Sequence, residues 1–191
     1  MKIYTDFFEK KGIVSGQILI TAKDFEDRDN KENLLNAFDT LFDIGVVPII
    51  NENDAVAVDE IKFGDNDMIA ANVASMLKAR HLFLITGVEG VYDKNPNKYD
   101  DAKVIRNYHD YVNKEIKFEG KTSHGTGGME SKVNAAILAT EVGTDVNIMG
   151  VEEIAEILKI IEGNVEVGTY FKGLENTITE EGVFPDVAIC L

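Results

Sequence analysis

Short apolar runs alternate along the chain with segments whose apolar residues recur at helical spacing. Residues 82–85, Leu-Phe-Leu-Ile, form a continuous apolar run of strand length, whereas the apolar positions between Leu34 and Phe42 return every three or four residues. The same comparison predicts strands at 16–21, 46–50, 82–85, 145–149 and 167–171. It predicts helices at 1–11, around 34–42, and at 67–79, 129–142 and 151–161.

Alternating strands and helices predict an α/β fold with a mostly parallel sheet and helices on both faces. The region 100–120 is mixed and charged and gives no clear prediction. Residues 172–191 show no periodicity either, and we expect a C-terminal extension without a clear domain there. Residues 1–171 are therefore expected to hold the structured domain.

Composition narrows the class of protein. The 191 residues are 45% hydrophobic and carry a formal charge of -15, which argues against a nucleic-acid partner because phosphate binding depends on Lys and Arg. No apolar run approaches the length that crosses a bilayer, and the first residues lack the apolar core of a signal peptide. The lone Cys190 excludes an internal disulfide and fits a cytoplasmic protein without a membrane partner.

Polar or glycine-rich clusters follow strands or open helices at three places, residues 51–67, 86–96 and 123–132. In parallel sheets, ligands bind beyond the carboxyl ends of the strands. The clusters are thus expected to line the rim of a ligand cleft.

In the third cluster, Ser-His-Gly-Thr-Gly-Gly-Met-Glu-Ser-Lys at 123–132, three glycines precede a predicted helix. Glycines let backbone N–H groups approach an oxyanion, and a helix N-terminus favours negative charge. Lys132 lies in the first turn and can reach a bound phosphate. The spacing is not that of a Walker A loop, and a flexible loop before an ordinary helix explains the pattern equally well.

In the first cluster, Asp54 offers an anion and Asn66 an amide, which suit the ammonium and carboxylate of an amino-acid ligand. Asp65 or Asn66 can equally cap the helix that starts near Asp67. Asp65 and Asp67 can also bind magnesium, although two carboxylates alone are weak evidence for a metal.

In the second cluster a strand ends at Thr86, and repeated turn residues favour a hairpin-rich connection over a base pocket near Val91 and Tyr92. The three histidines do not have metal-ligand spacing, and no Ser/His/Asp or Cys/His arrangement is present.

Taken in order, four stretches resemble the glutamate 5-kinases of the amino acid kinase family. They are VVPIINENDAV at 46–56, EIKFGDND at 60–67, GVYDKNP at 90–96 and HGTGGMESK at 124–132. VGTYF at 167–171 also resembles the last strand of that catalytic domain. The resemblance covers roughly residues 1–171 and implies a three-layer α/β/α amino acid kinase domain.

The resemblance implies phosphoryl transfer from ATP to the side-chain carboxylate of L-glutamate, giving glutamyl 5-phosphate for proline biosynthesis. It implies Mg²⁺ as a cofactor, proline as a feedback inhibitor and a homo-oligomer. Asp54 and Asn66 are placed on glutamate, and Asp67 orients catalytic lysines, of which Lys132 is one. ATP binding is implied for Thr86, Gly87, Thr126, Gly127, Gly128, Met129, Glu130, Ser131 and Lys132. The family commonly has Asp at the position of Gly87.

The chain departs from the family at its start. The family's domain begins with a strand and a Gly-rich segment that carries another catalytic Lys, followed by a Ser/Thr-Gly-Ala stretch, and neither is found here. We therefore expect a domain incomplete at the N-terminus, and little or no glutamyl phosphate from residues 1–191 alone. Two alternatives are a non-catalytic nucleotide- or amino-acid-binding module, and an amino acid kinase with another carboxylate or phosphate acceptor.

Overall fold

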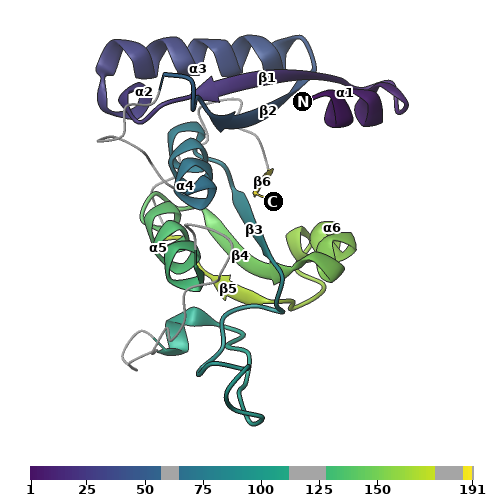
Figure 1. Cartoon of the computed structure of the whole chain (residues 1–191), viewed down its shortest axis with the longest axis vertical. Coiled ribbons are helices and arrows are strands. Elements are labelled where there is room, and N and C mark those ends of the chain that lie inside the picture. The colour runs from purple at the N-terminus through teal and green to yellow at the C-terminus, as the bar shows by residue number, and fades with distance from the viewer. Residues whose placement is uncertain (57–64, 112–127, 175–186, 191) are drawn as a thin grey trace. The chain divides into compact units, whose positions relative to one another are not determined.

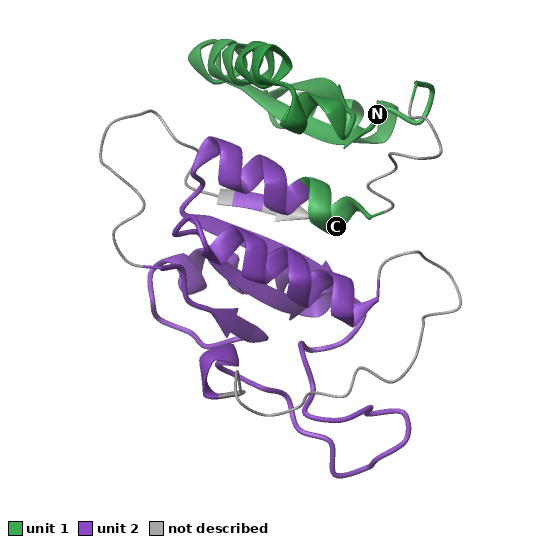
Figure 2. Ribbon diagram, turned by 90° about the vertical axis from the view of Figure 1, so that its left-hand side faces the viewer, with its two compact units in different colours: residues 1–69 green, residues 70–191 purple. Residues whose placement is uncertain are grey.

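The computed structural model describes residues 1–56, 65–111, 128–174 and 187–190. The chain divides into two compact units, Met1–Ile69 and Ala70–Leu191 (Figure 2). Because the two strand groups are not hydrogen-bonded to each other, each unit is described by itself.

The first unit pairs two parallel strands. β1 and β2 are in register from Val14 opposite Val46 to Ile20 opposite Glu52. Phe38, on the long helix between the strands, is fully buried and stacks on Phe42 with ring centroids 6.1 Å apart. In chain order the elements are α1 (Lys2–Glu9), β1 (Val14–Ile20), α2 (Lys23–Glu26), α3 (Arg28–Asp43) and β2 (Val46–Glu52).

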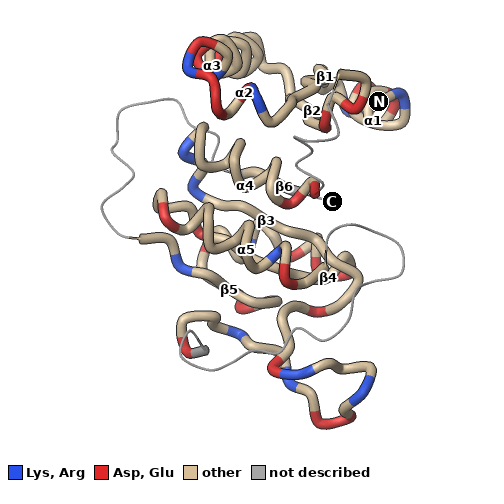
Figure 3. The backbone as a smooth tube through the Cα atoms, turned by 60° about the vertical axis from the view of Figure 1, so that its left-hand side comes forward, with Lys and Arg blue, Asp and Glu red and all other residues tan. Residues whose placement is uncertain are grey.

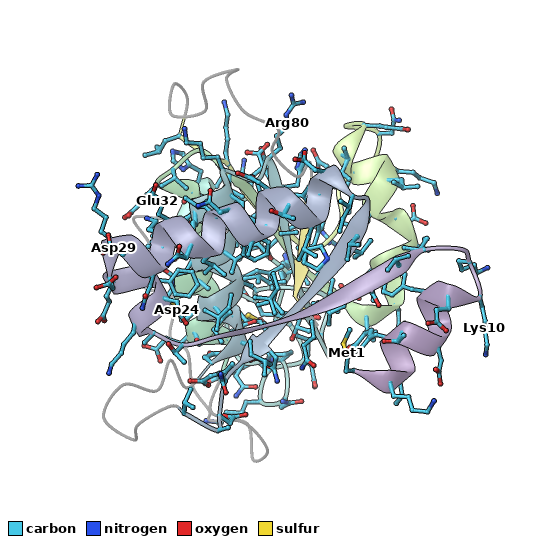
Figure 4. All side chains as sticks on the ribbon, turned by 90° about the horizontal axis from the view of Figure 1, so that it is seen from above. Met1, Lys10, Asp24, Asp29, Glu32 and Arg80 are labelled. Carbon is cyan, nitrogen blue, oxygen red and sulfur yellow. The ribbon has the colours of Figure 1, made fainter. Side chains whose placement is uncertain are left out.

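Local signals explain where α3 begins and ends. The Asp27 carboxylate accepts a hydrogen bond of 2.9 Å from the Asn30 N–H, which satisfies one of the free donors of the first turn. The acidic side chains of Asp29 and Glu32 are exposed near the same end (Figure 4). Gly45, at a φ of 71°, turns the chain from α3 into β2, a conformation that favours glycine.

The second unit is built on a four-stranded sheet with the order β5-β4-β3-β6. β3 is parallel to both β4 and β6, and β4 is antiparallel to β5. α4 (Asn66–Leu77) begins in the first unit and ends in the second. The other elements are β3 (His81–Thr86), η2 (Tyr108–Tyr111), α5 (Met129–Thr140), β4 (Asp145–Gly150), η3 (Val151–Glu156), α6 (Ile157–Ile161), β5 (Thr169–Phe171) and β6 (Val187–Cys190).

Helices cover both faces of this sheet (Figure 1). On one face Phe83, Ile85 and Met149 pack with Ile157 of α6. Side chains alternate along a strand, so Leu82 and Leu84, both fully buried, point to the other face, where α5 packs. A central strand buried on both faces requires a continuous apolar run, which is the pattern of residues 82–85.

The predicted α/β class with a mostly parallel sheet is confirmed. Two local predictions differ from the structure. The helix predicted at 151–161 is a 3₁₀ segment followed by a short α-helix, because the chain turns tightly where β4 ends at Gly150. Residues 172–191, for which no element is predicted, contribute β6.

Acidic residues, coloured red along the backbone tube of Figure 3, occur in both units. None of the helices in the described segments has the length and apolar character that a bilayer crossing requires.

Candidate functional site

β3 and β4 end level with each other, since Thr86 is the register partner of Gly150. Thr86 is half-buried, and Gly87 is exposed with nothing within 4 Å of the point where a Cβ would lie. Thr86 and Gly87 therefore occupy the edge at which parallel sheets bind ligands. Their contact with a nucleotide stays a prediction.

The segment that follows Gly87 is tied back onto β5. The buried Val91 N–H donates to Thr169 Oγ1 at 2.8 Å, and the Ile105 N–H donates to the Val91 carbonyl at 2.8 Å. Tyr92 forms an antiparallel bridge with Val104. These bonds agree with the hairpin-rich connection that the sequence favours for this cluster.

Tyr92 lies near three charged groups at the same edge. Burial is the main cause that raises the pKa of Tyr92 above its ordinary value, and the negative charges of Glu89 and Glu153 raise it further, against Arg106. The Tyr92 hydroxyl thus keeps its proton at neutral pH. Of these groups, Glu89 lies in the second predicted cluster, whereas Arg106 and Glu153 lie in none of the three.

α5 begins at the third cluster, as predicted. Gly128 is its N-cap and, as a glycine, supplies no side chain to accept a hydrogen bond from the first turn. The Lys132 N–H donates to the Gly128 carbonyl at 3.2 Å, which places the half-buried Lys132 in the first turn. Met129, Glu130 and Ser131 fill the turn between them, and Thr126 and Gly127 lie outside the described residues.

The far end of α5 lies beside the amino end of β4, where the Thr144 N–H donates to the Ala139 carbonyl at 3.3 Å. A 12-residue helix and a six-residue strand are both about 20 Å long, and α5 packs along β4. The start of α5 with Lys132 therefore lies toward the carboxyl end of β4.

In the first unit, the chain turns directly after β2. The Asn53 N–H donates to the Ile20 carbonyl at 2.8 Å, and the Val56 N–H to the Asn53 carbonyl at 3.1 Å. This turn leaves Asp54 exposed beyond the carboxyl end of β2. Asp54 is therefore accessible to a ligand, as its predicted role requires.

The two acidic residues at the start of α4, Asp65 and Asp67, have different surroundings. The Asp65 carboxylate accepts from the Asp67 N–H at 3.0 Å, so Asp65 caps the helix, as the capping alternative predicts. Asn66 is exposed, whereas Asp67 is only 3% exposed in the first turn. The helix dipole favours a carboxylate at that position.

Asp54, Asn66 and Asp67 belong to the first unit, and Thr86, Gly87 and Lys132 belong to the second. That these two sets converge on one cleft stays a prediction. Within the described segments no group of three His, Cys, Asp or Glu residues is arranged to hold a metal ion.

A cavity of about 370 Å³ in the second unit lies away from this edge. Its walls include His81 and Asp145, the first residues of β3 and β4, and Tyr170 of β5. The Asp145 carboxylate accepts from the Gly173 N–H at 2.9 Å and from the Tyr170 hydroxyl, so its hydrogen bonds serve the fold. Because parallel sheets bind ligands at the other end of their strands, we assign the functional site to the carboxyl edge.

The comparisons agree with the motifs. The model of the amino acid kinase family matches residues 1–150. A glutamate 5-kinase of Caldanaerobacter subterraneus subsp. tengcongensis is 38% identical over 186 residues, covering 96% of this chain and 50% of the relative. A glutamate 5-kinase of Lactococcus lactis subsp. lactis is 40% identical over 177 residues, covering 90% and 65%. The chain thus spans between half and two thirds of the length of these two relatives.

Solved structures show the same fold at lower identity. An isopentenyl phosphate kinase aligns with a TM-score of 0.58 and 18% identity, over 90% of this chain and 64% of that protein. The product complex of the T. acidophilum isopentenyl phosphate kinase aligns with a TM-score of 0.58 and 17% identity, over 87% of this chain and 63% of that protein. With a family match over most of its length and neighbours that share its fold, the chain belongs to the amino acid kinase family.

Proposed function

We propose that this chain is the nucleotide- and glutamate-binding part of a kinase that transfers a phosphoryl group from ATP to the side-chain carboxylate of L-glutamate. The product is glutamyl 5-phosphate, in the first step of proline biosynthesis. Support comes from the motifs and from the glutamate 5-kinases at 38% and 40% identity. Proline inhibition, a homo-oligomer and a cytoplasmic location accompany this activity in the resembled family and belong to the same proposal.

The observation that carries the proposal is the start of α5. Its N-cap is Gly128, which has no side chain of its own to cap the first turn, and Lys132 lies in that turn, toward the carboxyl end of β4. Backbone N–H groups, the helix dipole and an ammonium group together form a phosphate-binding arrangement. Thr86 and Gly87 lie at the carboxyl end of β3 in the same unit.

The chemistry requires such an arrangement. A carboxylate that attacks a triphosphate brings like charges together, so positioning and electrostatic stabilisation supply most of the catalysis. In the proposal, Lys132 neutralises the transferred phosphoryl group. The buried Asp67 holds a lysine in position, and it does not act as a base, since a carboxylate nucleophile is already deprotonated near neutral pH.

Mg²⁺ fits this site as a companion of ATP. Magnesium is commonly held by substrate phosphates together with one or two carboxylates. When bound, it screens the charge of the triphosphate. On the acceptor side, Asp54 binds the ammonium of glutamate and Asn66 hydrogen-bonds to the substrate.

The test is a pair of measurements on the same purified chain. Isothermal titration calorimetry with ATP and Mg²⁺, with and without L-glutamate, is expected to show binding of both ligands. Glutamyl hydroxamate formation with hydroxylamine measures turnover, with aspartate and isopentenyl phosphate as comparison acceptors. Glutamate-dependent turnover identifies a kinase, and binding of both ligands without turnover identifies the non-catalytic module. Binding of neither ligand would overturn the proposal.

Asp54→Ala separates the two halves of the proposed site. It is expected to weaken glutamate binding by about tenfold or more, because an ion-paired hydrogen bond is lost, and to leave ATP binding unchanged. Loss of ATP binding with unchanged glutamate binding would show that the assignment of Asp54 is wrong.

A further inference from the structure

Glu153 carries a buried acceptor that the fold does not use. It lies in η3, three residues after β4 ends at Gly150. Its Oε2 atom is buried and has no hydrogen-bond partner among the described residues. A buried carboxylate oxygen without a donor is unfavourable, so such an atom at the carboxyl edge of a sheet points to a missing donor.

The Glu153 carboxylate lies close to Gly150, at the carboxyl end of β4. The Glu153 carboxylate and the Val88 carbonyl oxygen both lie within 3.2 Å of the point that a Cβ on Gly150 would occupy. Gly150 is the register partner of Thr86, so both acceptors lie at the level where β3 and β4 end. Only glycine at position 150 leaves room for the Glu153 carboxylate there.

Neighbouring cations are engaged with other groups. Arg106 donates to the Gly168 carbonyl at 3.4 Å and lies 4.0 Å from the Glu89 carboxylate. Lys159 pairs with Glu156 at 2.8 Å. Glu153 Oε2 and the Val88 carbonyl oxygen are thus neighbouring acceptors, and Arg106 and Lys159 pair elsewhere, so a neutral donor such as a hydroxyl or an amino group suits them.

We infer that Glu153 accepts a hydrogen bond from the nucleoside part of the bound nucleotide, either from a ribose hydroxyl or from the exocyclic amino group of the base. This inference rests on the proposed function, and it names a residue that determines nucleotide affinity. Gly87 contributes no side chain at the end of β3, and its surroundings are open, so a nucleoside has access to this edge.

The experiment measures the dissociation constant of ATP by calorimetry for the wild-type chain, Glu153→Gln and Glu152→Gln. Glu152→Gln is the matched control, because it removes the same charge from an exposed neighbouring side chain. Glu153→Gln is expected to raise the dissociation constant about tenfold, because the charge-assisted hydrogen bond to the carboxylate becomes a weaker, neutral one. The control is expected to change it less than twofold. Circular dichroism checks that each variant is folded.

Analogues of ATP on the wild-type chain locate the donor without any mutation. They are 2′-deoxy-ATP, 3′-deoxy-ATP and the triphosphate of purine riboside, which lacks the amino group. The analogue that lacks the relevant donor should bind as weakly as ATP binds Glu153→Gln, and that variant should not weaken it further. Equal affinity for all three analogues and ATP, or equal effects of the two Glu→Gln changes, would overturn the inference and leave the proposed function standing. No binding of ATP to the wild-type chain would overturn both.

Discussion

The two ends of the β3–β4 pair differ in the hydrogen bonds that several of their polar groups make. At the amino end, the Asp145 carboxylate accepts from Gly173 at 2.9 Å, and the fully buried Thr144 donates to the Ala79 carbonyl at 2.8 Å. At the carboxyl end, no atom of the described residues lies within 4 Å of the point where a Cβ on Gly87 would be, and Glu153 has a buried oxygen without a donor among the same residues. The hydrogen bonds at the amino end therefore stabilise the fold, and the carboxyl end is the one at which we propose that a ligand binds.

The largest effect that this comparison predicts is a difference between two glycines. A Cβ on Gly173 would overlap the Gly143 carbonyl and lie 3.0 Å from the Thr144 carbonyl carbon, which are backbone atoms that cannot move aside cheaply. Gly173→Ala is expected to lower the free energy of unfolding by about 3 kcal/mol. Gly87→Ala, the matched control, is expected to change it by less than about 0.5 kcal/mol. Urea denaturation measures both, and equal losses would remove the contrast between the ends.

A second prediction concerns Asp145 itself. Asp145→Ala leaves the Gly173 N–H and the Tyr170 hydroxyl without their charged acceptor, and the expected loss is about 2 kcal/mol. Glu156→Ala, which breaks the pair of Glu156 with Lys159 at the surface, is expected to cost less than about 0.5 kcal/mol. Urea denaturation at pH 7 compares the two variants. A loss for Asp145→Ala no larger than for Glu156→Ala would mean that the amino end is not a stabilising network.

Tyr170, at the amino end, makes the stability of the fold depend on pH. Burial first, and then the charge and hydrogen bond of Asp145, raise the pKa of Tyr170 above its ordinary value. Above about pH 10 the unfolded chain releases this proton and the folded chain retains it, so stability falls as the pH rises. Tyr170→Phe is expected to cost about 1 kcal/mol at pH 7 and to lose less stability than the wild type between pH 9 and 11. Chemical denaturation over this range measures the slopes, and parallel slopes would contradict the assignment.

The smallest predicted effect on stability is at Glu153. Because its buried oxygen has no donor among the described residues, Glu153→Gln is expected to change the free energy of unfolding by less than about 0.5 kcal/mol. The midpoint of thermal unfolding should then move by no more than about 2 °C. A decrease of more than about 1 kcal/mol in the free energy of unfolding would show that Glu153 stabilises the fold. The carboxyl end would then resemble the amino end.

Local patterns were sufficient for most of the fold. The apolar run at 82–85 predicts β3 because a strand buried on both faces leaves no polar alternation. Glycine and charge patterns likewise predict where α5 begins. The same patterns place Thr86 and Lys132 at ends of elements, although their roles stay predictions.

The features that the sequence does not predict, the position of Glu153 and the strand β6, depend on contacts between residues far apart in the chain. Glu153 lies beside Gly150 and Val88, which follow or end different strands. No local sequence motif predicts that these residues are close in the fold. A search for acidic residues just beyond each predicted strand would have included it. β6 depends on pairing with β3 far away in the chain, so its four residues give too little local signal.

The pairing of β6 with β3 also has a consequence for biosynthesis. The register joins His81 to Val187, so about 100 residues are made after one strand before its neighbour exists. At roughly 5–20 residues per second, the ribosome needs about 5–20 s for that interval. During this time one edge of β3 has no strand to pair with, which makes the nascent chain a natural client for a chaperone that shields exposed strand edges.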